Sequence, residues 1–236
     1  MIEFNFQNII FLDIETVPQY PDYQSVPDTF KKLWDKKAER LFDEQHKSPD
    51  EVYHKAGIFS EFGKIICVSV GYMYNNTLRV KSFYSDDNEA ELLSSFADMI
   101  EKQYSKNLAL TLCAHNGKEF DFPYLARRML LNDIRIPTVL NVAGKKPWEI
   151  NHIDTMELWK FGDYKNYTSL NLLTYIFDIP TPKDDIDGSM VCDVFYKDKD
   201  LDRIIRYCEK DVIAIAQLLR KYNYLALIPD ANIEIV

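Results

Sequence analysis

The chain has 236 residues, 47% of them hydrophobic and 14% aromatic, which is enough for a substantial core and excludes a disordered protein. A formal net charge of −9 argues against a protein that coats nucleic acid, because such binding requires many positive charges, but it permits one that grips a single chain end. The sequence has neither a basic leader nor an apolar run of about 20 residues, so we expect a cytoplasmic protein with one domain, residues 1–236.

The first predicted strand lies at residues 9–18, where β-branched and aromatic residues surround two acids, Asp13 and Glu15. Residues two apart in a strand point to the same face, so these carboxylates stand side by side. Taken alone, the pattern also fits a solvated strand end. An unpaired charge in an apolar setting is unfavourable, however, so partners are expected elsewhere in the chain.

A helical insertion is expected at about residues 20–62. Apolar residues at helical spacing predict a helix at 29–42, and the sequence from Ser48 predicts a second short helix that ends near Ala56. The charged face of the first helix is expected to lie in water. A lid over the acidic strand is the alternative.

Strands and helices alternate through the rest of the chain. Further strands are predicted at residues 64–73, 78–84, 108–114 and 151–155, with a hairpin turn at Asn75-Asn76. Helices are predicted at 89–104, 122–131, 169–177 and 201–222. Together with the first strand, this order predicts an α/β fold with a mixed five-stranded sheet flanked by helices.

Three further side chains extend the acidic pattern. Asp121 lies between the apolar strand at 108–114 and the next helix, where an N-terminal cap is the ordinary interpretation. Tyr207 and Asp211 lie four apart on the closing helix, so they share a face at the edge of its apolar stripe. A surface tyrosine beside a surface aspartate is the ordinary interpretation of that pair.

These residues form three motifs in a fixed order: Asp13-x-Glu15, Asn116-Gly117-Lys118-Glu119-Phe120-Asp121, and Tyr207-x-x-x-Asp211. The arrangement resembles the 3′-5′ exonucleases of the ribonuclease H-like superfamily that use four acids and a tyrosine. It is most similar to stand-alone relatives of the proofreading domain of family-B DNA polymerases. The resemblance runs from Phe11 to about Tyr222, is weakest between Tyr20 and Phe62, and implies a ribonuclease H-like fold.

The resemblance also implies roles for individual residues. Two divalent cations, Mg²⁺ or Mn²⁺, would be held by Asp13, Glu15, Asp121 and Asp211, and Tyr207 would contact the attacking water. The residues that resemble the family's contacts to terminal nucleotides are Thr16, Asn116, Phe120, Ser169 and Leu170, with Lys183 a looser candidate for a phosphate contact. Because an ordinary tyrosine has a pKa of about 10, we assign Tyr207 to orienting the water rather than to general-base catalysis.

Simple electrostatics agrees with a metal site. Two unit charges about 4 Å apart repel by about 4 kcal/mol at an effective dielectric constant of about 20, so four clustered carboxylates oppose folding. Divalent cations that prefer oxygen ligands cancel this repulsion. The acids therefore predict metal.

We expect a two-metal 3′-5′ exonuclease that binds single-stranded or frayed 3′ ends, with DNA favoured over RNA, and releases nucleoside monophosphates. An exoribonuclease on the same site and a catalytically idle nucleic-acid-binding module are the alternatives, and the complete set of acids argues against the idle module. No polymerase domain fits in this length. Proofreading in trans and repair therefore both stay open, as does the oligomeric state.

Other polar residues are assigned ordinary structural roles. Asp154 is either an acid behind the metal ligands or a hydrogen-bonded structural residue, and we favour the second. Arg127-Arg128 is expected on a solvated helix face rather than on phosphate. The four cysteines form no Cys-x-x-Cys pair and are expected to be buried free thiols, and the four histidines lack metal-ligand spacing.

Overall fold

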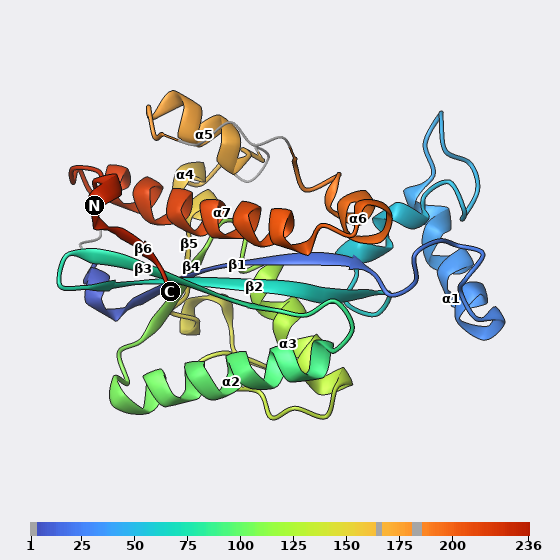
Figure 1. Cartoon of the computed structure of the whole chain (residues 1–236), viewed down its shortest axis with the longest axis horizontal. Helices are drawn as coiled ribbons and strands as arrows, with labels where there is room; N and C mark the ends of the chain where they lie inside the picture. The colour runs from blue at the N-terminus through green and yellow to red at the C-terminus, as the bar shows by residue number, and fades with distance from the viewer. Residues whose placement is uncertain (1–3, 164–166, 181–185) are drawn as a thin grey trace.

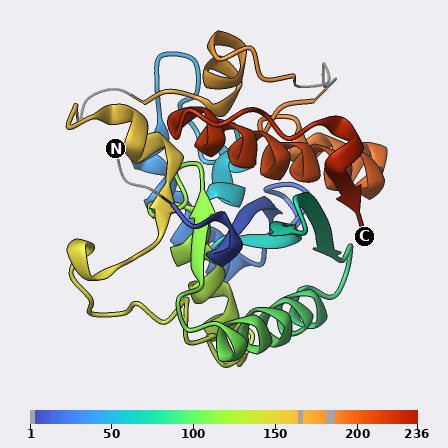
Figure 2. The same ribbon diagram turned by 90° about the vertical axis from the view of Figure 1, so that its left-hand side faces the viewer.

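The computed structural model describes residues 4–163, 167–180 and 186–236. Its strands are β1 (Ile9–Pro18), β2 (Gly63–Tyr74), β3 (Thr77–Tyr84), β4 (Thr111–Ala114), β5 (Ile153–Asp154) and β6 (Ile233–Ile235). Its helices are α1 (Asp28–Ala38), α2 (Glu89–Lys106), α3 (Asp121–Leu131), α4 (Thr155–Lys160), α5 (Leu170–Ile176), α6 (Val191–Asp193) and α7 (Leu201–Tyr222). Figure 1 shows α7 on one face of the sheet and α2 with α3 on the other, and Figure 2 shows the same layers end on.

The sheet has the strand order β5-β4-β1-β2-β3-β6, which places β1 in the interior. β1 pairs antiparallel with β2 and parallel with β4. Its residues alternate between two cores: Ile10 and Leu12 pack on the side of α2 and α3, and Ile9 and Phe11 pack on the side of α7. Asp13 and Glu15 continue the second set, so the fold turns both acids toward α7.

The closing helix α7 covers its face of the sheet with a continuous apolar stripe, as its spacing predicts. Asp200 caps its first turn by accepting a 3.0 Å hydrogen bond from the backbone N–H of Arg203. Gly71 of β2 allows the close approach, since a Cβ at this position would lie 2.7 Å from Cγ1 of Val212. This packing lets α7 lie close against β2, the strand next to β1.

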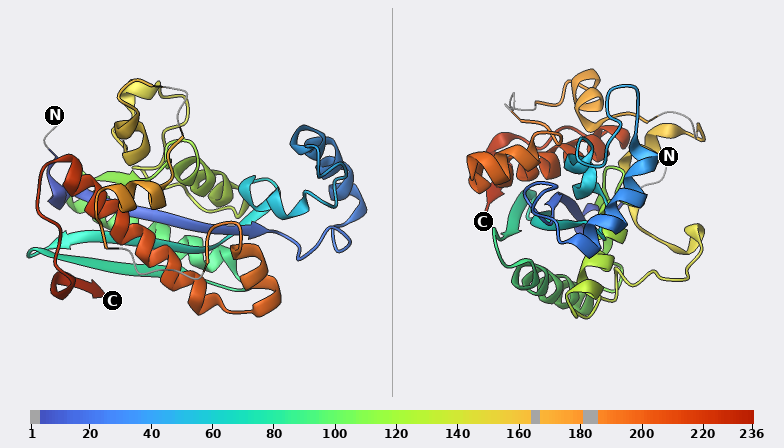
Figure 3. Two further views of the ribbon diagram at one scale, coloured as in Figure 1. Left: turned by 90° about the horizontal axis from the view of Figure 1, so that it is seen from above. Right: turned by 90° about the vertical axis from the view of Figure 1, so that its right-hand side faces the viewer.

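The predicted insertion lies between β1 and β2 and projects from the end of the molecule away from both termini (Figure 3). It has its own apolar cluster around the fully buried Trp34, whose indole N–H donates a 2.9 Å hydrogen bond to the carbonyl of Pro49. The predicted short helix that ends near Ala56 is wrong. Turns held by the Glu51 carboxylate lead instead into a 3₁₀ helix, Tyr53–Ile58.

The expected five-stranded sheet needs a correction to six strands within the residues described. β6 pairs parallel with β3 at the sheet edge, and three residues are too few to show an alternating pattern. The strand predicted from Leu108 begins at Thr111, because Leu110 N–H closes a turn onto the carbonyl of Asn107. The ribonuclease H-like α/β arrangement itself is confirmed.

The predicted hairpin turn is also confirmed. Asn75 and Asn76 both have positive φ, 48° and 64°, as a tight hairpin turn requires. Among the helices described, none is long and apolar enough to cross a membrane. The cysteines are free thiols, of which Cys192 alone is partly exposed.

Candidate active site

The two acids of β1 lie under α7 in a setting that opposes their ionisation. Glu15 is 7% exposed and Asp13 is half-buried. Burial raises the pKa of both carboxyls well above the ordinary range, and the charges of Asp211 and Asp121 raise them further. For all three of Asp13, Glu15 and Asp121, the neighbouring charges that shift the pKa most are acidic rather than basic.

Asp121 reaches the same place from α3. The N-cap of α3 is Phe120, so capping is not the role of Asp121, which stands first in the helix and is 3% exposed. The pairing of β1 with β4 ends at Phe11, so β4 offers no partner to Ile14. The Ile14 amide donates to the carboxyl of Asp121 instead. Burial raises the pKa of Asp121 to about 8, the charges of Asp154 and Asp211 act in the same direction, and the backbone hydrogen bonds oppose them.

Tyr207 and Asp211 complete the group from α7, where they are hydrogen-bonded to each other. Burial raises the pKa of Tyr207 well above that of a free phenol, and the charges of Asp211, Glu15 and Asp13 raise it further. The phenol is therefore a proton donor at neutral pH. The structure thus brings together side chains from β1, α3 and α7 that are separated by more than about 80 residues along the sequence.

Cys208 is a member of this group that the sequence motifs do not reveal. Its thiol donates to Oδ2 of Asp13 at 3.4 Å, and the nearest ligand atoms of Asp13, Glu15 and Cys208 lie within 4.8 Å of one another. Burial raises the pKa of this thiol, and so do Cys67 and the two acids, so it stays protonated. The position of Cys208 on the apolar stripe beside Tyr207 was the available signal.

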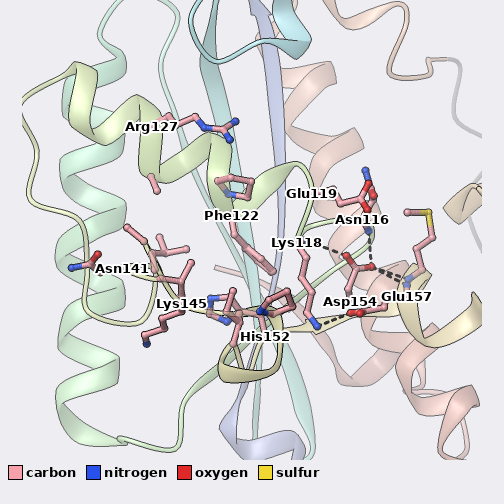
Figure 4. A pocket seen from close by; sticks show the side chains of 18 of the residues that line it. Asn116, Lys118, Glu119, Phe122, Arg127, Asn141, Lys145, His152, Asp154 and Glu157 are labelled. Carbon is pink, nitrogen blue, oxygen red and sulfur yellow. Dashed lines mark hydrogen bonds and ion pairs between the residues drawn. The ribbon is translucent and has the colours of Figure 1, made fainter. Parts of the chain in front are cut away.

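The loop from β4 to α3 is shaped by Asp154. Its carboxylate accepts hydrogen bonds from the backbone N–H groups of Asn116 at 2.9 Å and Lys118 at 3.1 Å, and it also caps α4 (Figure 4). Asn116 is left-handed, with φ 64°, a conformation that asparagine tolerates. A Cβ on Gly117 would lie 2.3 Å from Cβ of Ala114. Asp154 therefore has the structural role that was favoured, and it positions the segment that leads to Asp121.

The predicted nucleotide contacts have these positions. Thr16 hydrogen-bonds the hydroxyl of Tyr124, and half-buried Phe120 packs on the same ring at 5.3 Å between centroids. Ser169 caps α5 and Leu170 packs against two core clusters. Oδ1 of Asn116 is buried without a hydrogen-bond partner among the described residues. Lys183 lies outside the described residues, and the nucleotide-binding role of all six stays a prediction.

Tyr167 is a second tyrosine near the acids that sequence reasoning missed. It is 68% exposed and hydrogen-bonds Asn116. Partial burial raises its pKa, and the charges of Glu119 and Asp121 raise it further. The neighbouring carbonyl of Thr168 accepts a 2.9 Å hydrogen bond from Nε2 of His115. The segment before α5 is thereby held against the end of β4.

The expectation for Arg128 is wrong. This side chain is 7% exposed rather than solvated, and its Nε donates a 2.9 Å hydrogen bond to Glu89 of α2. Another of its nitrogens donates to the carbonyl of Ser60 in the insertion. Arg127 is exposed, as expected.

A family model matches residues 58–226, which is more than half of the chain and includes Asp121, Tyr207 and Asp211. The family is described as a predicted 3′-5′ exonuclease related to the exonuclease domain of PolB. The chain belongs to this exonuclease family. Asp13 and Glu15 lie before the matched residues, so their place in the site rests on the geometry of β1.

A solved structure shows a likeness in fold over nearly the whole chain. The family-B DNA polymerase of the hyperthermophilic archaeon Pyrobaculum calidifontis is similar in fold with a TM-score of 0.57 and 14% sequence identity. The likeness covers 92% of this chain and 24% of the polymerase chain. This exonuclease-family chain therefore corresponds to about a quarter of that polymerase in length.

Proposed function

We propose that this chain is a metal-dependent 3′-5′ exonuclease that hydrolyses the terminal phosphodiester at DNA 3′ ends and releases nucleoside monophosphates. The observation that carries the proposal is the convergence of Asp13, Glu15 and Asp121 on one buried spot beside the hydrogen-bonded pair of Tyr207 and Asp211. A buried cluster of acids that raise one another's pKa is unfavourable without cations, so it supports a ligand-binding rather than a structural role.

The donor atoms fit hard divalent cations. The four acids supply carboxylate oxygens, the ligands that Mg²⁺ and Mn²⁺ prefer, and the protonated thiol of Cys208 acts as a hydrogen-bond donor rather than as a soft ligand. We assign Asp13, Glu15, Asp121 and Asp211 as the residues that would hold two such ions. When bound, the ions would supply a more acidic water and would neutralise the charge of the departing 3′ oxygen.

The side chains themselves have separate tasks. Tyr207, kept neutral by its surroundings and fixed by Asp211, would orient the attacking water through its hydroxyl. The raised pKa argues against Tyr207 as a general base. The unpartnered Oδ1 of Asn116 supports a contact with the terminal nucleotide, and the half-exposed ring of Phe120 supports base stacking. Thr16, Ser169, Leu170 and Lys183 keep their proposed places along the same nucleotide.

DNA is favoured as the substrate because the chain resembles a domain of DNA polymerases. An exoribonuclease on the same acids is the second candidate. A catalytically idle binding module is the third candidate. The buried acids argue against it, because their mutual repulsion destabilises the fold and an idle module would gain nothing from keeping them.

The test is a nuclease assay on 5′-labelled single-stranded DNA, matched duplex, mismatched duplex and RNA, with Mg²⁺, Mn²⁺ or EDTA. Wild type with metal should give a ladder of shortened DNA products, and Asp211→Asn should lose activity by at least a hundredfold. Asp98→Asn, which removes an exposed acid of α2, is the matched control and should retain activity. Faster cleavage of RNA would favour the exoribonuclease, and equal inactivity of wild type and Asp211→Asn would favour the idle module.

A further inference from the structure

The thiol of Cys208 on α7 contacts Asp13 at two points. Its sulfur lies 3.4 Å from Oδ2 of the Asp13 carboxylate and 3.5 Å from the backbone carbonyl oxygen of the same residue. A donor placed between a carboxylate and its own backbone restricts rotation of that side chain, because rotation breaks the contact with the carboxylate. Cys208 therefore limits the directions in which the Asp13 carboxylate can face.

Cys208 is itself held by tight packing. It is completely buried, as is its neighbour Cys67 of β2, and both belong to an apolar cluster with Ile205. The sulfur of Cys67 is a competing acceptor for the Cys208 thiol. A carboxylate oxygen is a stronger acceptor than sulfur, so the thiol hydrogen is directed to Asp13.

A stronger donor next to Asp13 is turned away from it. Ser69 of β2 stands directly opposite Asp13 in the strand register. Its Oγ lies 2.8 Å from Oγ of Ser82, and the Ser82 hydroxyl donates a 2.8 Å hydrogen bond to Oε1 of Glu209. Because Ser82 gives its one hydrogen to Glu209, Ser69 must donate to Ser82. Ser69 therefore has no hydrogen left for the Asp13 carboxylate.

The donor that Asp13 does receive is weak, because a thiol donates less strongly than a hydroxyl or an amine. It can orient a carboxylate while taking little of the negative charge that a metal ion requires. Glu15 has a similar neighbour, since Cys67 stands opposite it in the register of β1 and β2 and their charges interact. Each acid of β1 therefore adjoins a thiol, which leaves the carboxylate charge available to a cation.

The number of oxygens that Asp13 can offer to one ion affects the choice of ion. Ca²⁺ takes about six to eight oxygen ligands and often binds both oxygens of one carboxylate, whereas Mg²⁺ and Mn²⁺ favour octahedral sites. Turning both oxygens of Asp13 toward the same ion would separate Oδ2 from the Cys208 thiol. A carboxylate held in this way suits the smaller ions.

We propose that Cys208 is a positioning residue that makes Asp13 offer one oxygen to each bound ion, and that the site thereby selects Mg²⁺ and Mn²⁺ over Ca²⁺. The proposal rests on the proposed metal-dependent function and adds the residue that sets the choice of ion. Cys208 acts through Asp13 and is not itself a ligand. The hydrogen-bond donor, rather than the volume of the side chain, carries the effect.

The test measures ion binding without substrate. The electron paramagnetic resonance signal of free Mn²⁺ gives the Mn²⁺ affinity, and displacement of bound Mn²⁺ by added Ca²⁺ gives the Ca²⁺ affinity. Cys208→Ala removes the donor and should lower the ratio of Mn²⁺ to Ca²⁺ affinity by about tenfold. Cys208→Ser keeps a donor at the same place and should hold the ratio within about threefold of wild type.

The matched control is Cys113→Ala, which removes another completely buried free thiol, from the apolar cluster between the sheet and α7. It should keep the wild-type ratio, and thermal unfolding in EDTA checks that each variant is folded. A Cys208→Ala protein with the wild-type ratio would overturn the inference. So would an equal fall in Cys208→Ser, because that result would assign the effect to packing.

The same measurements separate this inference from the proposed function. A wild-type protein that binds no Mn²⁺ would refute the proposed metal-dependent function, and the inference with it. A wild-type protein that binds Mn²⁺ but cleaves no nucleic acid would refute the proposed exonuclease activity, and the effect of Cys208 on ion choice would still stand or fall on the affinity ratios.

Discussion

The acid cluster should make the metal-free protein less stable as the pH rises. The pKa of Asp121 in the folded protein is about 8, compared with 3.8 for an ordinary aspartate. The folded state therefore binds this proton more tightly than the unfolded state, so its stabilising effect is complete below about pH 4 and is lost as the pH rises through about 8. At 1.36 kcal/mol per unit, the part lost between about pH 5.5 and 8 is roughly 3 kcal/mol, or about 6–12 °C in Tm for a chain of this size.

Thermal unfolding in EDTA and in Mn²⁺, measured at several pH values across this range, tests the prediction. The Tm of wild type in EDTA should fall with rising pH, and Mn²⁺ should raise Tm more at high than at low pH. Asp121→Asn should be more stable than wild type in EDTA at high pH and should have a flatter profile. A wild-type Tm in EDTA that is independent of pH, or an Asp98→Asn control that matches Asp121→Asn, would refute the electrostatic reasoning.

Three further substitutions have definite expected outcomes. Gly71→Ala should lower the free energy of unfolding by about 1–3 kcal/mol in urea titration, because its Cβ would lie 2.7 Å from Val212; an unchanged midpoint would contradict close packing of α7. Arg128→Ala should cost about 3–5 kcal/mol in the same titration, since it leaves Glu89 buried without its partner, and Glu89→Gln combined with it should recover part of the loss. Tyr207→Phe should lower kcat by about ten- to a hundredfold in the nuclease assay with Tm preserved, and a kcat equal to wild type would remove Tyr207 from the mechanism.

The convergence of the acids follows from periodicity and topology together. The spacing of Asp13 and Glu15 sets a common strand face, and the spacing of Tyr207 and Asp211 sets a common helix face. The chain order of the strands predicts that the closing helix packs on the sheet. The strand face with the acids and the helix face with Tyr207 and Asp211 are therefore expected to face each other. The sequence is therefore informative wherever a short-range period decides the direction of a side chain.

The contacts that sequence reasoning missed lie between separate elements of the chain. The hydrophobic pattern of one element does not show which residue of another element it contacts. Arg128 and Glu89 are on different helices, and only the packing of α2 against α3 makes their charges partners. Tyr167 precedes a short helix, and its place near Asn116 depends on the fixed turn around Asp154. β6 has three residues, fewer than a pattern requires. Such features depend on tertiary distances that no local propensity encodes.

The end of β1 explains why the insertion matters for a site to which it gives no acid. The pairing of β1 with β2 shifts register between Glu15 and Thr16, directly after the second acid. Beyond this irregularity, Tyr124 of α3 hydrogen-bonds both Thr16 and the carbonyl of Gly57, where it donates at 2.7 Å. The insertion is thus tied through one tyrosine to the strand end that carries the acids and to the helix that begins with Asp121. Its 3₁₀ turn thus helps to hold together two of the three elements that carry the proposed metal ligands, and this structural role does not require the insertion to act as a lid.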